Sequence, residues 1–232
     1  EAEDSWFIAD DIFYDSIGRK VKMIDPDMGV WTYEYDVLGN LLRQTDAKGQ
    51  ILRFEYDALN RLEKKLSLRA IDTAGVNGEA ISEYFYDDPS KENCRGRLSK
   101  VIDSSGLTEF FYDKLGREVK STKSLRAIDT EGVNGEAISS YTVKRTYDIL
   151  DRLVTLKYPD GEVVTYTYDL NSGLLERVEG AVPDPVDPLQ LKAAVPYVQS
   201  ITYDAQGKIK NILYGNNTST AYTYGQDLRL SD

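Results

Sequence analysis

Residues 53–62 read RFEYDALNRL, and close relatives of this phrase recur along the chain. They are YEYDVLGNLL at 33–42, FFYDKLGREV at 110–119, KRTYDILDRL at 144–153, YTYDLNSGLL at 166–175 and SITYDAQGKI at 200–209. Five of these six phrases have an aromatic or apolar residue one or two positions before the Tyr-Asp pair, and all six have turn-forming residues after it. A catalytic site needs its residues once, so a phrase repeated about nine times indicates architecture.

The Tyr-Asp pairs follow a regular spacing. They are Tyr14-Asp15, Tyr35-Asp36, Tyr56-Asp57, Tyr86-Asp87, Tyr112-Asp113, Tyr147-Asp148, Tyr168-Asp169 and Tyr203-Asp204, with a degenerate copy at Tyr224-Gly225. Successive tyrosines are 21, 21, 30, 26, 35, 21, 35 and 21 residues apart. The base period is therefore 21 residues, and the longer gaps contain insertions. We interpret these residues as a structural repeat motif rather than as individual binding residues.

Residues 33–56 show what one period builds. Tyr33 and Tyr35 alternate with polar residues, which places both rings on one face of a strand. Strands at 41–45 and 51–56 follow, and short turns separate them. Because tight turns connect antiparallel strands, each period predicts one hairpin, and stacked hairpins bury each other's edges.

The turn after each Tyr-Asp pair has its own signal. Three residues after the aspartate stand Gly18, Gly39, Asn60, Gly116, Asp151 and Gly207. All three residue types tolerate the left-handed backbone region, and glycine tolerates it best. We therefore predict an all-β protein, in which antiparallel β-hairpin repeats stack into a long, curved and twisted sheet.

Composition excludes several classes of function. The net charge of −11 argues against a nucleic-acid or anionic membrane surface, because both require clustered Lys and Arg. The chain has no histidine, which removes Ser-His-Asp and Cys-His catalysis and most transition-metal sites. Cys94 is the single cysteine and has no partner base. We expect no enzyme activity, no catalytic residue, no cofactor, no metal site and no membrane insertion.

Three short features are weak candidates for binding or modification. Asp10-Asp11 and the pair Asp25 and Asp27 could hold a hard cation, but they lack the residue order of a calcium loop. Residues 216–219 (NNTS) contain two overlapping glycosylation sequons, which matter in a eukaryotic source.

Four insertions interrupt the period, at 67–82, 89–95, 124–139 and 179–199. The segments 67–82 and 124–139 differ at one position and each contains Asn-Gly, which is typical of a type I′ turn. They predict two longer hairpin arms, either a paired recognition feature or a recent duplication. The prolines of 179–199 predict a loop with one helical turn rather than a strand. The segment 89–95 reads as a polar turn extension around Cys94.

The phrases YDKLGR at 112–117 and YDSIGR at 14–19 resemble the YD repeats of the Rhs family. This family includes bacterial Rhs proteins, the B and C subunits of Tc insecticidal toxin complexes and the animal teneurins. Residues 25–50 resemble the bacterial branch, and ITYDAQG at 201–207 with YGNN at 214–217 is similar to the Tc shell. The resemblance covers residues 13–230.

This resemblance implies that the hairpins form the wall of a hollow, spiralling β-shell, which encapsulates a C-terminal toxin or effector polypeptide. Residues 1–232 would then be a single YD-repeat array, cut from a larger bacterial protein that is secreted or on the cell surface. Its partners would be neighbouring repeats of the parent chain and the enclosed effector. The alternative is a cell-surface adhesion or carbohydrate-binding module, in which tyrosine ladders stack against sugars.

The resemblance also raises the question of self-cleavage. Rhs proteins and Tc C subunits cleave themselves near an Asp-Pro-x-Gly-Leu type of motif. Residues 184–189 (DPVDPL) lack the glycine, so this activity is not expected here.

Overall fold

A computed structural model describes residues 11–68, 79–126, 137–225 and 227–231. The strands are β1 (Asp11–Tyr14), β2 (Lys20–Asp25), β3 (Gly29–Tyr35), β4 (Leu41–Thr45), β5 (Ile51–Tyr56), β6 (Leu62–Leu68), β7 (Glu79–Tyr86), β8 (Leu98–Asp103), β9 (Gly106–Tyr112), β10 (Glu118–Arg126), β11 (Ala137–Tyr147), β12 (Leu153–Lys157), β13 (Val163–Tyr168), β14 (Leu175–Ala181), β15 (Val195–Tyr203), β16 (Ile209–Tyr214) and β17 (Ser219–Ala221). In these ranges no helix is long and apolar enough to cross a membrane.

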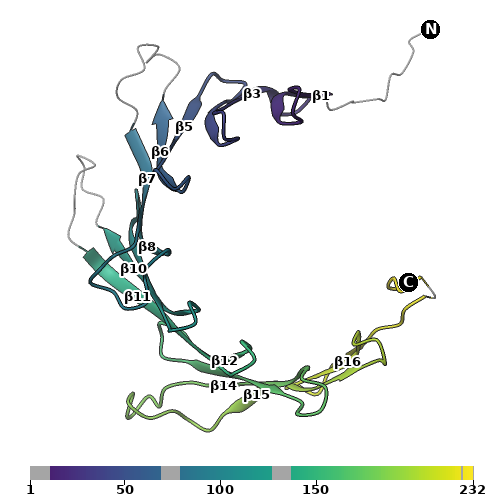
Figure 1. The fold of residues 1–232 in the computed structure, drawn as a ribbon. Coiled ribbons are helices and arrows are strands. Elements are labelled where there is room, and N and C mark those ends of the chain that lie inside the picture. The colour runs from purple at the N-terminus through teal and green to yellow at the C-terminus, as the bar shows by residue number, and fades with distance from the viewer. Residues whose placement is uncertain (1–10, 69–78, 127–136, 226, 232) are drawn as a thin grey trace. The chain divides into compact units, whose positions relative to one another are not determined.

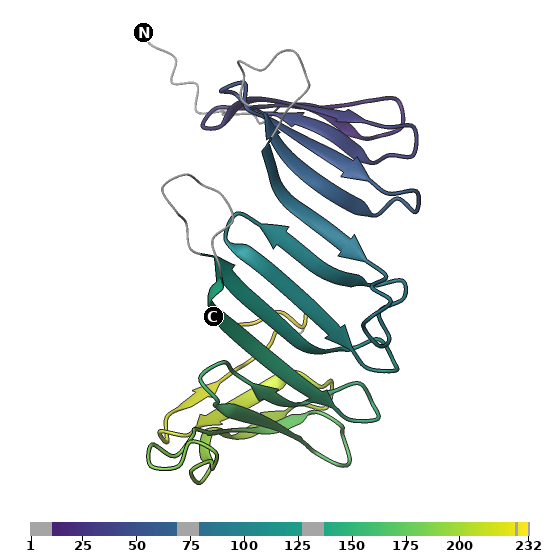
Figure 2. The ribbon, with the colours of Figure 1, turned by 90° about the vertical axis from the view of Figure 1, so that its left-hand side faces the viewer.

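Figure 1 shows the strands along the chain, which divides into two compact units. Unit 1 comprises Glu1–Glu109 and Leu125–Ile138, and unit 2 comprises Phe110–Ser124 and Ser139–Asp232. In unit 1 each strand from β1 to β9 pairs antiparallel with the next one. The same holds from β11 to β17 in unit 2. Figure 2 shows the strands of each unit fanning out, as twisted sheets do. The predicted all-β class and antiparallel hairpin repeats are confirmed.

The hairpins have the predicted strands and one feature that the sequence did not reveal. Strands β4 and β5 have the predicted bounds, Leu41–Thr45 and Ile51–Tyr56. The register shifts just before a repeat tyrosine, as between Glu34 and Tyr35 or between Glu55 and Tyr56. Such a bulge increases the local twist and changes the direction of the side chain beside it. The repeat tyrosine is therefore set apart from its strand neighbours.

In the described parts of the chain, no second layer covers the paired strands. In β3 the residues alternate between half-buried and exposed. Among the described residues, the only buried hydrophobic side chains are those of Cys94 and Val164. The chain is long enough to form a sizeable core, but its hairpins are instead held together by lateral contacts with their neighbours, as in other repeat proteins.

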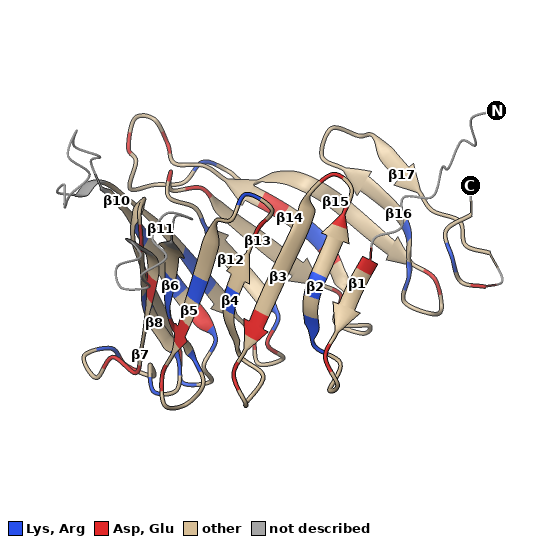
Figure 3. Ribbon diagram, turned by 90° about the horizontal axis from the view of Figure 1, so that it is seen from above, with Lys and Arg blue, Asp and Glu red and all other residues tan. Residues whose placement is uncertain are grey.

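Acidic and basic residues are intermingled on the strands (Figure 3). Glu34 lies opposite Arg43 on neighbouring strands, and their charged atoms are 3.5 Å apart. Lys64 and Glu83 form a similar pair at 3.7 Å. Exposed pairs of this kind contribute at most about 1 kcal/mol, so they adjust the packing of the hairpins rather than create it.

The insertion at 179–199 differs from the prediction. Strand β14 continues to Ala181 and β15 begins at Val195, so the irregular segment is 182–194. That segment contains turns and, as described, no helix. Pro196 lies within β15 opposite Glu179, where the register shifts. A bulge can accommodate a residue that has no N–H to donate, so a proline did not exclude a strand here.

The two predicted arms are described only at their bases. Strands β6 and β7 flank the first arm, and β10 and β11 flank the second. The Asn-Gly pairs at 77–78 and 134–135 lie outside the described residues, so the predicted type I′ turns stay a prediction.

Candidate functional site

The turns that follow the Tyr-Asp pairs share one hydrogen-bond pattern. Oδ1 of Asp57 accepts the N–H groups of Leu59 and Arg61, both at 2.9 Å, and Oδ2 accepts Nε–H of Arg61 at 2.8 Å. Asn60 in this turn has a φ of 61°. Its counterparts are also left-handed, namely Gly18 (84°), Gly39 (91°), Gly116 (86°), Asp151 (62°) and Gly207 (80°). The carboxylate of Asp15, Asp36, Asp113, Asp148 or Asp204 accepts the equivalent backbone N–H groups. The aspartate therefore closes the turn.

At seven of the described repeats, the tyrosine hydroxyl joins one hairpin to the preceding one. Tyr56 donates to the carbonyl of Leu41, the first residue of β4, at 3.0 Å. The same bond, at 2.7–2.9 Å, runs from Tyr35 to Lys20, Tyr86 to Leu62, Tyr147 to Glu118, Tyr168 to Leu153, Tyr203 to Leu175 and Tyr224 to Ile209. Each acceptor is the first residue of its strand. Insertions between the repeats do not disturb this bond, which explains why tyrosine recurs.

An arginine completes the connection between neighbouring turns. Arg61 pairs with Asp57 of its own turn and with Asp87 of the next turn, each at 2.7 Å. Its guanidinium lies 4.3 Å from the centroid of the Tyr86 ring. We call this set of contacts, between an arginine and the Tyr-Asp pair of the next repeat, the Tyr–Asp–Arg junction. The cation–π contact and the charged hydrogen bonds both hold the same guanidinium, so together they stabilise the contact between the two turns.

Three other arginines occupy the same position. Each pairs with the aspartate four residues before it and lies over the tyrosine of the next repeat: Arg19 over Tyr35 at 5.0 Å, Arg117 over Tyr147 at 5.0 Å and Arg152 over Tyr168 at 4.4 Å. Each also donates to a backbone carbonyl of the next turn. Sequence reasoning missed this role. The sequence feature that could have revealed it is a basic residue five positions after the repeat tyrosine.

Several repeats depart from this pattern. Asn40 stands in the arginine position and donates to Asp36 and to Asn60. The insertion at 89–95 lengthens the turn of Asp87, whose carboxylate accepts the N–H of Gly96. The turn of Asp169 is one residue longer, because its N–H donates to the carbonyl of Leu174. The junctions are thus variations on one scheme.

The hydrogen bonds to the turn carboxylates shift their acidity. The backbone N–H of Arg61 lowers the pKa of Asp57 most, and the Arg61 side chain lowers it further. The side-chain amide of Asn40 is the main cause of the lowered pKa of Asp36. At Asp148, burial is the largest effect and raises the pKa, but hydrogen bonds from Arg152 outweigh it, so the pKa is lowered. These carboxylates are ionised acceptors at neutral pH.

The turns at the other edge of the sheet use the same chemistry. Oδ1 of Asp46 accepts the N–H groups of Lys48 at 2.9 Å and Gln50 at 2.8 Å. Asp25 accepts the N–H of Asp27 at 2.8 Å. The aspartates that were weak cation candidates at this edge are therefore turn residues, while Asp10 lies outside the described residues. In the ranges described, no group of three or more His, Cys, Asp or Glu is placed to hold a metal ion.

Comparison with protein-family models gives the family. The model described as RHS Repeat matches residues 14–51 and 35–76, which cover the first three Tyr-Asp pairs. Residues 14–76 of the chain are therefore RHS repeats. Comparison with curated proteins gives no significant match.

The fold of the chain is similar to solved Tc toxin structures. A crystal structure of TcdB2-TccC3 matches with a TM-score of 0.77 and 19% identity over 95% of this chain. A crystal structure of TcdB2-TccC3-Cdc42 matches with a TM-score of 0.76 and 20% identity over 95%. A mutant of the Photorhabdus luminescens Tc holotoxin pore matches with a TM-score of 0.74 and 20% identity over 94%. The present chain spans 10–11% of the length of those chains, and identities this low establish the fold alone.

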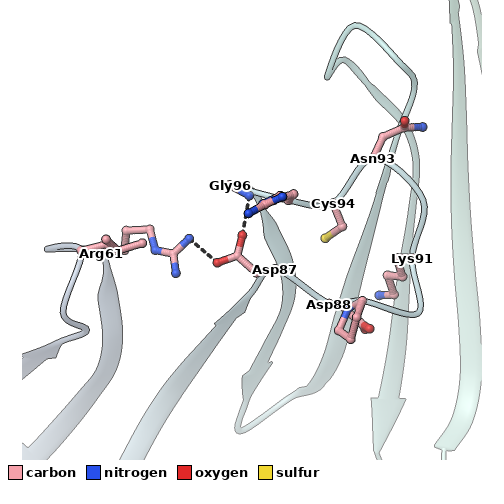
Figure 4. Close-up of a pocket in the computed structure, with 10 residues that line it drawn as sticks. Arg61, Asp87, Asp88, Lys91, Asn93, Cys94 and Gly96 are labelled. Carbon is pink, nitrogen blue, oxygen red and sulfur yellow. Dashed lines mark hydrogen bonds and ion pairs between the residues drawn. The ribbon is translucent and has the colours of Figure 1, made fainter.

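A pocket of about 700 Å³ lies beside the turn extension at Asp87 (Figure 4). Two of its basic groups pair with protein carboxylates. Arg61 pairs with Asp87, and Nζ of Lys91 pairs with Glu109 at 2.9 Å. Cys94 is 1% exposed. These contacts support a packing role for the cysteine.

We expect the Tyr56→Phe substitution to lower the free energy of unfolding by about 1 kcal/mol, the usual contribution of one hydrogen bond. It removes the hydroxyl that donates to Leu41 and keeps the ring. Denaturant unfolding of both proteins measures this effect. Tyr33→Phe is the matched control, because the Tyr33 hydroxyl makes no hydrogen bond in the described structure. Equal losses from the two variants would show that the hydroxyl bond between repeats adds nothing.

The RHS-repeat turns also predict which substitutions are tolerated. Gly39 has a φ of 91° and open space where a Cβ would lie. Asn60 occupies the equivalent position with a φ of 61°. We expect Gly39→Asn to change the unfolding free energy by less than about 0.5 kcal/mol, and Gly39→Val to cost about 2 kcal/mol, since β-branched residues avoid positive φ. Thermal or urea unfolding separates the two, and similar values would contradict the turn model.

Proposed function

We propose that this chain is a wall segment of a hollow RHS-repeat shell, and that the shell of the parent protein encloses an effector polypeptide. The Tyr–Asp–Arg junctions are the observation that carries this proposal. In the described residues, tyrosine hydroxyl bonds fasten hairpins to their neighbours, four junctions add an arginine, and few hydrophobic side chains are buried. A structure with such nearest-neighbour contacts can be extended by adding repeats.

The likeness to TcdB2-TccC3 supports the same proposal. Those chains are about nine times longer than this one and contain the same fold over 95% of it. About nine hairpins are too few to enclose a polypeptide domain. We therefore propose that residues 1–232 belong to a single repeat array of a longer parent, and that the predicted Tyr-Asp motif residues serve this architecture.

The remaining expectations follow from the wall role. The segment is proposed to have no catalytic activity, and its partners are neighbouring repeats of the parent chain and the enclosed effector. Nucleic acid and membrane insertion are not part of the proposal, in line with the net charge of −11. The parent is proposed to be a bacterial protein that is secreted or on the cell surface.

Electron microscopy of the full parent protein, combined with treatment by a broad-specificity protease, tests this function. Hollow particles with a protected C-terminal polypeptide are the expected result. An open sheet whose C-terminal region is digested at once would overturn the proposal. The carbohydrate-binding alternative would then be tested by glycan-binding assays.

A further inference from the structure

Among the described turns, three have another residue in the arginine position: Asn40, Leu174 and Lys208. Asn40 donates to Asp36, and Lys208 lies over the Tyr224 ring, whereas the side chain of Leu174 has no polar group to offer.

In the turn that begins at Asp169, Leu174 stands where the four junction arginines stand in their turns, since its carbonyl accepts the aspartate N–H. The next repeat tyrosine, Tyr203, still donates to Leu175 at 2.7 Å. Its ring is therefore held in the same way as the rings that lie under a guanidinium elsewhere. The junction has the usual frame and no cation of its own.

A cavity occupies the place of the missing side chain. It measures about 330 Å³, and Asp169, Leu174, Glu176, Tyr203 and Asp204 contribute to its lining. Three of these residues are acidic and none is basic. The whole cavity lies within unit 2. We call it the 169/203 socket.

The neighbouring junction shows what such a site holds. Nε of Arg152 donates to Oδ2 of Asp148 at 2.7 Å, and its guanidinium lies 4.4 Å from the Tyr168 ring centroid. In the 169/203 socket, the corresponding Oδ2 of Asp169 accepts no hydrogen bond from any described residue. No described cation lies over the Tyr203 ring. The carboxylate of Asp169 is nevertheless ionised, because hydrogen bonds from the backbone and side chain of Ser172 lower its pKa.

We propose that the 169/203 socket binds an arginine side chain of another polypeptide segment, in the position that the chain's own arginines fill at four other junctions. A guanidinium is planar, stacks on a tyrosine ring and presents several N–H donors to a carboxylate. An ammonium group offers a point charge without that shape, so arginine is favoured over lysine. The socket thus gives the chain a selective contact for a partner segment that carries arginine.

N-acetyl-L-arginine amide is the probe for the test. The full chain, labelled at its tyrosine rings, is titrated while NMR follows the Tyr203 resonances. N-acetyl-L-citrulline amide, which is neutral and nearly the same shape, is the control ligand. Saturable shifts at Tyr203 with the arginine probe and none with citrulline are expected, with a dissociation constant on the order of millimolar for so small a ligand. Equal shifts with both ligands would overturn the proposal.

Two variants test the site from opposite directions. Leu174→Arg supplies an internal guanidinium and should abolish the probe-induced shifts at Tyr203. Arg152→Leu empties the neighbouring junction and should create a second site, seen as new shifts at Tyr168. Asp169→Asn should weaken binding about tenfold through loss of one charged hydrogen bond. Unchanged binding to Leu174→Arg, or no new site in a folded Arg152→Leu protein, would contradict the assignment.

Discussion

Replacing Gly215 by alanine is expected to lower the free energy of unfolding by about 3 kcal/mol, the upper range for overpacking in a tight site. Gly215 follows β16, and its N–H donates to the carbonyl of Tyr197 at 2.9 Å. A Cβ at this position would overlap the carbonyl oxygen of Pro196. That oxygen belongs to the backbone of β15, so it cannot move aside as the tip of a flexible side chain could. Either β15 shifts or the hydrogen bond breaks.

Gly207→Ala is the matched control for this substitution. Gly207 also lies in unit 2, and it has a φ of 80° with no atom within 4 Å of the place where a Cβ would lie. Its replacement therefore carries only the conformational cost of a left-handed alanine, about 1 kcal/mol. Urea unfolding followed by circular dichroism compares the two variants. A Gly215→Ala midpoint equal to that of Gly207→Ala would contradict the close approach of β15 and β16.

Lowering the pH is expected to unfold the chain, because the turn carboxylates become protonated. The pKa is lowered at eight turn aspartates: Asp15, Asp36, Asp57, Asp87, Asp88, Asp113, Asp148 and Asp169. A carboxyl group with a lower pKa in the folded state stabilises that state above its unfolded pKa. This stabilisation disappears as the pH falls through the folded pKa.

The urea midpoint should therefore be nearly constant between about pH 7 and pH 5 and fall steeply below about pH 4, the ordinary aspartate range. Unfolding curves at half-unit pH steps measure this. Asp57→Asn removes one of the titrating groups and should make the acid fall shallower while lowering stability at pH 7. A midpoint that stays constant down to pH 3 would mean that the turn carboxylates do not stabilise the fold.

The local structure of the repeats could be predicted from sequence because it depends on residues close together in the chain. Asp57 and Asn60 specify their turn through bonds that span at most four residues. The strand bounds of β4 and β5 followed from alternation and turn signals. Such features need no knowledge of which hairpin lies beside which.

The contacts between repeats could not be predicted in this way. Arg61 reaches Asp87 across 26 residues, and nothing in a single repeat distinguishes this arginine from a solvated one. Pro196 reads as a strand breaker until the bulge opposite it is known. The junctions join residues of neighbouring turns, so they can be recognised only when it is known which turn lies beside which.

The hydroxyl bonds between repeats also determine how the chain would respond to force. A pull on the two ends loads the junctions in sequence, and each junction belongs to one pair of hairpins. Rupture of one junction would release a repeat of 21 residues, about 70 Å of extended chain, before the next junction bears the load. The force–extension record would rise and fall once per repeat, with longer intervals where insertions lengthen the spacing to 26, 30 or 35 residues.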